Sequence, residues 1–288
     1  MIVHKPRGWS LGHTHLYLRS TMNVWPSLLY AAASDGDVAM VRNLIDRGAS
    51  VDWYHPDTGM SALAIAVHKG HTGVVDVLAK HGASVTNAHD EIAAEEPIIH
   101  ACRYGNLEMV RTLINHGATL NFARVSPLVT AAVNNQAPVV ELLLNHKANP
   151  NCRDRSGYTA FMLSHRSSLP ILQLMLEHNA DPNAKAPSGQ RCLNNYIWAD
   201  DYDKVKLVLE HRADPNVDPA SLCASTYLSL AFQQKRFEIS QLLVDYGADK
   251  GLLIRDRVSP TFQGIYDSLS TLFIITLLVV VGVQYMFL

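Results

Sequence analysis

The segment EPIIHACRYGNLEMVRTLINHGAT, residues 96–119, contains two short helical patterns separated by a glycine. In the second pattern Val110, Leu113 and Ile114 are spaced i, i+3 and i+4, which places them on one face of a helix. Gly117 follows where that helix must end, because glycine adopts the left-handed conformation without a Cβ clash. The segment therefore predicts two antiparallel helices, which together cannot bury their own apolar face.

The second helical pattern recurs along the chain with nearly constant spacing. Each copy has an alanine near its end, as expected where neighbouring units pack closely, and successive alanines lie 34, 35, 30, 32, 33 and 35 residues apart. A period of about 33 residues predicts stacked helical hairpins that share one continuous core. The seven copies are VRNLIDRGAS (41–50), VDVLAKHGAS (75–84), VRTLINHGAT (110–119), VELLLNHKAN (140–149), LQLMLEHNAD (172–181), VKLVLEHRAD (205–214) and ISQLLVDYGAD (239–249).

Segments rich in small residues precede these copies, as in SALAIAVHKG (61–70) and SPLVTAAVNN (126–135). Small side chains let a first helix pack closely on the second. Between units, ANPN (148–151) and ADPN (180–183 and 213–216) contain a proline, which leaves the helical region and opens a turn. We therefore expect an all-α fold, an α-solenoid of helix-turn-helix units.

The repeating unit resembles the ankyrin repeat, most clearly in residues 61–84 and 96–119. The resemblance covers residues 25–250 and implies an array of about seven repeats joined by short β-hairpin-like loops. Two units depart from the family's pattern. The fifth lacks the glycine between its helices and is about one residue short, and the sixth has Asp200 in place of that glycine. We expect the array to be less stable there.

The composition changes after the last repeat. Residues 251–268 are an expected linker, and the final 20 residues, LSTLFIITLLVVVGVQYMFL (269–288), carry no charged side chain. Twenty helical residues rise about 30 Å, the thickness of a bilayer's hydrocarbon core, so this segment predicts a transmembrane helix. The alternative is a helix that caps the last repeat, although a cap needs a polar outer face. Residues 1–24 contain no long apolar run and are expected to be a flexible leader.

The charges around the hydrophobic segment predict its orientation. Lys250, Arg255 and Arg257 precede it and no basic residue follows it, which places the repeats in the cytosol. The arrangement resembles that of tail-anchored proteins. The lack of basic residues beyond the segment favours the endoplasmic reticulum or the secretory pathway over mitochondria.

Composition and cysteine spacing argue against several functional classes. The net charge of -2 and the pI near 6.7 are not typical of a nucleic-acid-binding protein. Zinc ligands come in pairs a few residues apart, and no two cysteines are that close. We expect reduced thiols, no metal and no cofactor. The cysteines are Cys102, Cys152, Cys192 and Cys223.

The sequence contains none of the motifs that mark common enzymes: no Gly-rich phosphate loop, nucleophile elbow or HExxH helix. We therefore expect no catalytic activity. The acidic cluster Asp200, Asp201 and Asp203 lacks the spacing of a calcium loop and is expected to be a solvated turn. Five of the fourteen histidines recur at one repeat position near the helix ends and are expected to be structural: His81, His116, His146, His178 and His211.

The ankyrin resemblance implies that a partner binds at the hairpin tips and on the concave face of the first helices, here at the residues just before the turn between the two helices. Arginine, tyrosine and tryptophan dominate binding energy at such surfaces. We expect a non-catalytic, membrane-tethered scaffold or adaptor for an unidentified cytosolic protein. The alternative is a soluble regulatory or inhibitory module whose last helix serves as a cap or an oligomer contact. The candidate contact residues are His68, Lys69, Arg103, Tyr104, Asn134, Arg166, Trp198 and Gln233 on the first helices, and Arg153 and Arg155 at a loop tip.

Overall fold

The computed structural model describes residues 24–86, 96–121, 126–154, 156–164, 167–216 and 226–249. Apart from one isolated antiparallel bridge between Tyr54 and Ser61, the regular structure of these residues is helical. They belong to two compact units, of which the first ends at Asp181 and the second begins at Pro182. The predicted all-α fold of repeated helical hairpins is confirmed.

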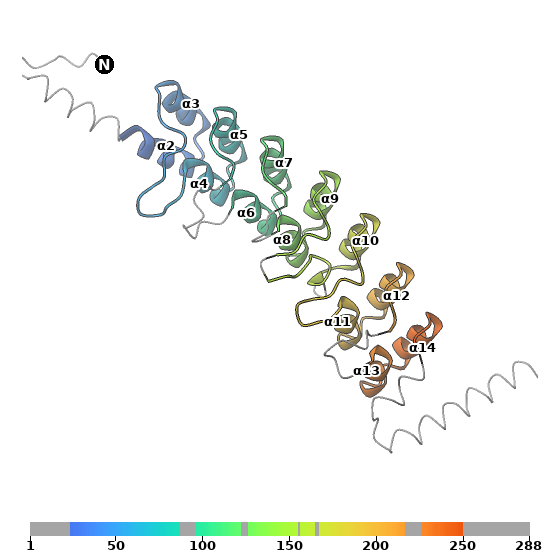
Figure 1. Cartoon of the computed structure of the whole chain (residues 1–288). Coiled ribbons are helices and arrows are strands. Elements are labelled where there is room, and N and C mark those ends of the chain that lie inside the picture. The colour runs from blue at the N-terminus through green and yellow to red at the C-terminus, as the bar shows by residue number, and fades with distance from the viewer. Residues whose placement is uncertain are drawn as a thin grey trace, which may run out of the picture. The chain divides into compact units, whose positions relative to one another are not determined.

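The helices of the first unit alternate between two rows (Figure 1). Each helix contacts its neighbour in the same row, and four hairpins (α2–α3, α4–α5, α6–α7 and α8–α9) connect the two rows. One row contains α2 (Val24–Asp35), α4 (Ala62–Lys69), α6 (Pro97–Tyr104) and α8 (Pro127–Val133), and the other contains α3 (Val38–Asp46), α5 (Thr72–Lys80), α7 (Leu107–Asn115), α9 (Ala137–Asn145) and α10 (Leu169–Glu177).

The second unit repeats this arrangement with two hairpins. Its first helices contact each other, its second helices contact each other, and each first helix contacts the second helix that follows it. The first hairpin consists of α11 (Cys192–Trp198) and α12 (Tyr202–Glu210), and the second of α13 (Tyr227–Gln233) and α14 (Phe237–Asp245).

The α6–α7 hairpin illustrates how the local sequence sets the helix ends. Pro97 begins α6, where a missing N–H costs nothing. Gly105 ends it with a φ of 70°, in the left-handed region that favours glycine. The Asn106 side chain then caps α7 by accepting a hydrogen bond of 3.1 Å from the backbone N–H of Met109. The turn between the two helices is therefore encoded in two consecutive residues, Gly105 and Asn106.

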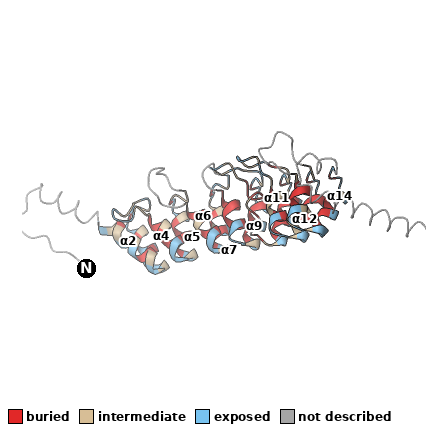
Figure 2. Ribbon diagram, turned by 90° about the horizontal axis from the view of Figure 1, so that it is seen from below, coloured by how far each residue is buried: buried red, intermediate tan, exposed pale blue. Residues whose placement is uncertain are grey.

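The core lies between the two helices of each hairpin and between neighbouring hairpins, where the buried residues line the inner sides of the helices (Figure 2). The alanine that defines the repeat period is buried in all seven copies, with an exposed fraction of at most 8%. This confirms that the chain is closely packed at that position. The seven residues are Ala49, Ala83, Ala118, Ala148, Ala180, Ala213 and Ala248.

The five recurrent histidines are helix C-cap residues, as their position in the repeat predicts. The Nδ1 atom of His211 lies 2.9 Å from the carbonyl oxygen of Leu207, which also accepts a hydrogen bond from the backbone N–H of His211. His116 instead reaches into the preceding repeat, where its Nε2 lies 3.1 Å from the carboxylate of Asp76. The C-cap residues are His81, His116, His146, His178 and His211.

The fifth repeat differs from the prediction of a first helix in every unit. Within residues 159–164 the chain forms turns and a single 3₁₀ position, and α10 alone is an α-helix of this repeat among the described residues. The hydroxyls of this segment bond to nearby backbone, which competes with the helical ladder. The hydroxyl of Ser164 donates to the carbonyl of Phe161 at 2.6 Å, and the hydroxyl oxygen of Thr159 accepts from the N–H of Met162 at 3.3 Å. Phe161 and Met162 nevertheless remain buried.

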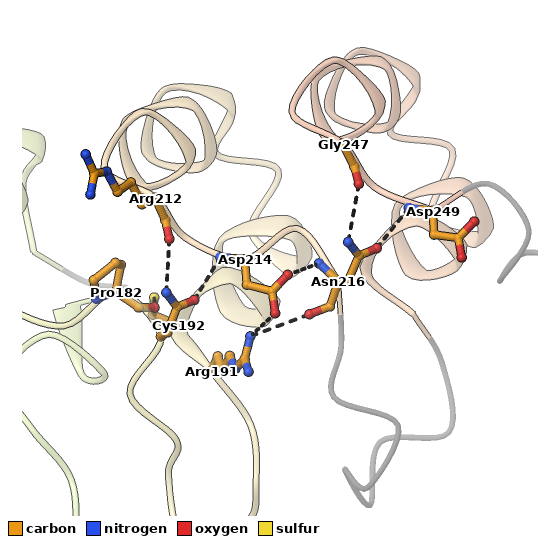
Figure 3. A network of polar contacts seen from close by, with 9 residues as sticks. Pro182, Arg191, Cys192, Arg212, Asp214, Asn216, Gly247 and Asp249 are labelled. Atoms are coloured by element: carbon orange, nitrogen blue, oxygen red, sulfur yellow. Dashed lines mark hydrogen bonds and ion pairs between the residues drawn. The ribbon is translucent and has the colours of Figure 1, made fainter.

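One side-chain bridge recurs between consecutive repeats. The amide oxygen of Asn183 accepts a hydrogen bond of 2.8 Å from the N–H of Asp214, and its amide nitrogen donates to the carbonyl of Arg212 at 3.0 Å. Asn216 makes the same two bonds to the next repeat (Figure 3). The bridge ties the end of a second helix to the preceding loop. At other junctions the acceptor side chain and the N–H donor are Asp52 and Ser84, Asn121 and Asn149, and Asn151 and Asp181.

The predicted terminal segments fall outside the described residues. These are the leader (1–24, apart from Val24 at the start of α2), the linker (251–268) and the hydrophobic segment (269–288). Among the helices that the structure does describe, none has the length and apolar character needed to cross a bilayer.

Candidate protein-binding surface

The candidate contact residues of the first helices lie at the last turn of those helices or just after it. Every described member is exposed, and Tyr104 and Trp198 stand out among the large side chains, with exposed fractions of 68% and 55%. Arg155 and Arg166 lie outside the described residues. The exposed members are His68, Lys69, Arg103, Tyr104, Asn134, Arg153, Trp198 and Gln233.

Three of these residues share one cleft in the first unit. His68 and Lys69, at the end of α4, and Tyr104, at the end of α6, line a cleft of about 310 Å³ between consecutive repeats. Below this rim the walls are apolar, because Ala101 and Met109 are buried core residues. The sequence pattern predicted that the rim residues are exposed, but not that they enclose a common space. The other lining residues are Val67, Gly70, His100, Ala101, Asn106 and Met109.

Three aromatic rings form a row along one side of the cleft. The ring centroids of His68 and His100 are 4.7 Å apart, and those of His100 and Tyr104 are also 4.7 Å apart. His100 was not among the predicted contact residues. Its spacing of i, i+4 to Tyr104 on one helix is the sequence signal that could have identified it.

The electrostatics of the cleft centre on His100. Burial lowers the pKa of His100 below the usual histidine range, and the neighbouring His68 and Arg103 lower the pKa further by charge repulsion. The ring is therefore neutral at pH 7 and can both donate and accept a hydrogen bond. Among the residues that line the cleft there is no carboxylate, and Lys69 is exposed at its rim.

Two of the predicted contact residues are partly held by their own segment. The side-chain amide of Asn134 donates to the carbonyl of Thr130 at 2.8 Å, in the same helical turn. Nη1 of Arg153 donates to the carbonyl of Gly157 at 2.6 Å and closes the loop at that tip. Both side chains therefore contribute to local structure as well as to the surface.

The acidic cluster of the second unit has structural partners. Asp200 forms an ion pair of 2.7 Å with Arg236 of the next repeat. Asp201 caps α12, accepting from the N–H of Lys204 at 3.1 Å, and pairs with its ammonium group at 2.9 Å. These contacts account for the carboxylates as part of the inter-helix turn, as the sequence predicts.

The described residues contain no group of three or more histidine, cysteine or acidic side chains placed to hold a metal ion. Of the described cysteines, Cys102 and Cys192 are buried and Cys152 is half-buried, and all three are thiols that form no disulfide bond. Burial raises the pKa of Cys102 to about 12, so this thiol stays protonated and unreactive at neutral pH.

A family model described as ankyrin repeats matches the chain in three copies, over residues 15–89, 85–154 and 128–219. The chain belongs to the ankyrin-repeat family. The structure adds a further ankyrin hairpin beyond the matched residues, formed by α13 and α14. Ankyrin repeats are protein–protein interaction modules, and the proteins that carry them generally act without catalysis.

Two curated relatives of this ankyrin protein are much longer chains. Ankyrin repeat and KH domain-containing protein mask-1 of Caenorhabditis elegans is 29% identical over 235 residues, which are 81% of this chain but 8% of that protein. Ankyrin repeat and SAM domain-containing protein 6 of Danio rerio is 30% identical over 135 residues, 45% of this chain and 18% of that protein. The chain therefore spans less than a fifth of either relative.

The fold also matches a solved ankyrin structure. The ankyrin repeat domain of Bcl-3, described as a unique member of the IkappaB protein family, superposes with a TM-score of 0.67 at 23% identity. The match covers 75% of this chain and 97% of the Bcl-3 domain. At this level of identity, the similarity establishes the ankyrin fold alone.

Proposed function

We propose that the protein is a non-catalytic, membrane-tethered ankyrin scaffold or adaptor that binds a cytosolic protein through the ends of its first helices. The observation that carries the proposal is the exposure of Tyr104 and Trp198 at equivalent turns of an interaction module. Large aromatic side chains supply most of the energy at protein interfaces when a partner covers them. Both side chains remain mostly exposed, although the ring of Tyr104 also contacts the ring of His100.

The tethering part of the proposal rests on the sequence of residues 269–288. These 20 residues carry no charged side chain, and as a helix they would match the thickness of a bilayer's hydrocarbon core. Lys250, Arg255 and Arg257 precede them, which favours a cytosolic position for the repeats.

We expect Tyr104→Ala to weaken binding of the cytosolic partner by about 30-fold, because loss of an interface anchor costs about 2 kcal/mol. Proximity labelling with the full-length protein in cells identifies the partner, and titration of that partner against each variant measures the loss. Tyr246→Ala is the matched control, since Tyr246 is an exposed tyrosine at the end of a second helix, α14. Equal binding by the two variants would contradict the proposed surface.

Deletion of residues 269–288 is expected to move the protein from the membrane fraction to the soluble fraction. The full-length protein should resist alkaline extraction and require detergent for release, because a spanning helix has no soluble partner for its apolar surface. Recovery of the full-length protein without detergent would refute the tether. If the deletion abolished self-association and left the distribution unchanged, residues 269–288 would be an oligomer contact instead.

A further inference from the structure

The cleft between α4 and α6 has two chemically different parts. Its inner wall is apolar and includes the buried residues Ala101 and Met109. Its rim carries the exposed Lys69 and His68. An occupant that satisfies both parts must present an apolar group to the wall and an anionic group to the rim.

We infer that this cleft receives an acidic peptide segment of the partner, with one apolar side chain against Met109 and a neighbouring carboxylate at Lys69 and His68. The inference rests on the proposed function and specifies the chemistry of the partner. A volume of about 310 Å³ is at the lower end of the range for small-molecule sites, so it suits one or two side chains of a peptide.

Charge complementarity favours an acidic segment and fixes its position along the array. The residue that precedes the turn is Asp35 in the first repeat, Lys69 in the second and Asn134 in the fourth. A carboxylate is therefore attracted over the second repeat and repelled by the first. This change in charge along the array orients the peptide segment, because its acidic residue must lie away from Asp35.

The histidine row makes the interaction sensitive to pH. Burial and the neighbouring His68 and Arg103 keep the pKa of His100 below the usual histidine range, whereas a bound carboxylate stabilises the protonated form of this imidazole, so binding is coupled to proton uptake by His100. The affinity should therefore rise as the pH falls from neutrality toward the lowered pKa of His100. Three helices pack against α6. The titratable side chains on α4 are His68 and Lys69, those on α7 are Glu108 and Arg111, and α8 carries none. On α6 itself, Arg103 and Tyr104 share the helix with His100.

A peptide selection tests this inference with the full-length protein in a non-ionic detergent. Short random peptides displayed on phage are selected on the immobilised protein, and enriched sequences are synthesised with a fluorescent label. We expect the enriched peptides to place aspartate or glutamate beside a large apolar residue. Their dissociation constants are then measured by fluorescence anisotropy at several pH values.

Two variants with the same change in charge distinguish peptide binding in the cleft from binding elsewhere on the surface. Lys69→Glu is expected to weaken the selected peptides by about tenfold or more, because it places like charges together. Arg111→Glu, on the exposed side of α7, should leave the affinity unchanged. His100→Phe keeps a ring between His68 and Tyr104 but cannot take up a proton, so it should reduce the rise in affinity at low pH.

The inference is overturned if selection enriches no acidic peptides, if Lys69→Glu and Arg111→Glu weaken them equally, or if the affinity does not change with pH. These failures are distinct from failure of the proposed function. If Tyr104→Ala still disrupts recruitment of the cytosolic partner while no acidic peptide binds, the surface is correct and the chemistry assigned to the cleft is wrong.

Discussion

Replacing Phe161 with alanine is expected to lower the free energy of unfolding by about 3–5 kcal/mol. Phe161 is 1% exposed and lies in the segment of the fifth repeat that forms turns in place of a first helix. Because this segment has no helical ladder over residues 160–163, its position depends on the burial of its side chains. Truncation of the ring removes that apolar burial and leaves a cavity that the turns can fill only in part.

Phe237→Ala is the matched control for this prediction. It deletes the same ring from a position that is 55% exposed, at the start of α14, and should cost less than about 1 kcal/mol. Urea denaturation followed by far-ultraviolet circular dichroism compares the two variants, and hydrogen exchange of α10 shows whether the loss is local. A cost for Phe161→Ala no greater than that of Phe237→Ala would show that the fifth repeat does not depend on its buried ring.

Gly36→Ala is expected to lower the free energy of unfolding by about 2–3 kcal/mol, because backbone strain adds to a steric clash with the ring of His71. Gly36 has a φ of 78°, a conformation that strains any residue with a Cβ. A Cβ at this position would also lie 2.7 Å from Nδ1 of the His71 ring. The ring cannot move away freely, because Nε2 of His71 donates to the carbonyl of Ser34 at 3.0 Å and links the first two repeats.

Gly48→Ala isolates the contact with His71 from the backbone strain. Gly48 has a φ of 88°, and no atom lies within 4 Å of a Cβ built there, so its cost should be about 1 kcal/mol, from strain alone. In a His71→Ala background, Gly36→Ala should cost no more than Gly48→Ala. Urea denaturation of the single and double variants measures this coupling, and an unchanged cost of Gly36→Ala would exclude the ring as its cause.

The sequence predicted the features of the fold that repeat with the period of the chain. The helix stripes, the stop at Gly117 and the buried alanine are each set by side chains within one unit, so their spacing is visible in the sequence. The first helix of the fifth repeat could not be predicted in the same way. Its sequence departs from the pattern, but whether Ser164 bonds within a helix or to a turn depends on the tertiary environment.

The sequence predicted which residues of the candidate surface are exposed, but not how their side chains are arranged. Repeat position alone indicated that Lys69 and Tyr104 are exposed near helix ends. The row of rings could not be read from that position, because His68 and His100 occupy different places in their repeats: His100 stands where the second repeat has the buried Ile65. Their contact depends on how far α4 and α6 are offset, and that offset is a property of packing.

The bridges formed by Asn183 and Asn216 have a consequence for how such an array changes over time. Each side chain bonds to a main-chain N–H and a main-chain carbonyl of the following unit, which every residue except proline provides. When recombination duplicates or removes a unit, the asparagine of each remaining unit can therefore form the same two hydrogen bonds with the main chain of its new neighbour. The side chains that face a partner can diversify independently, because the joint between units does not depend on them.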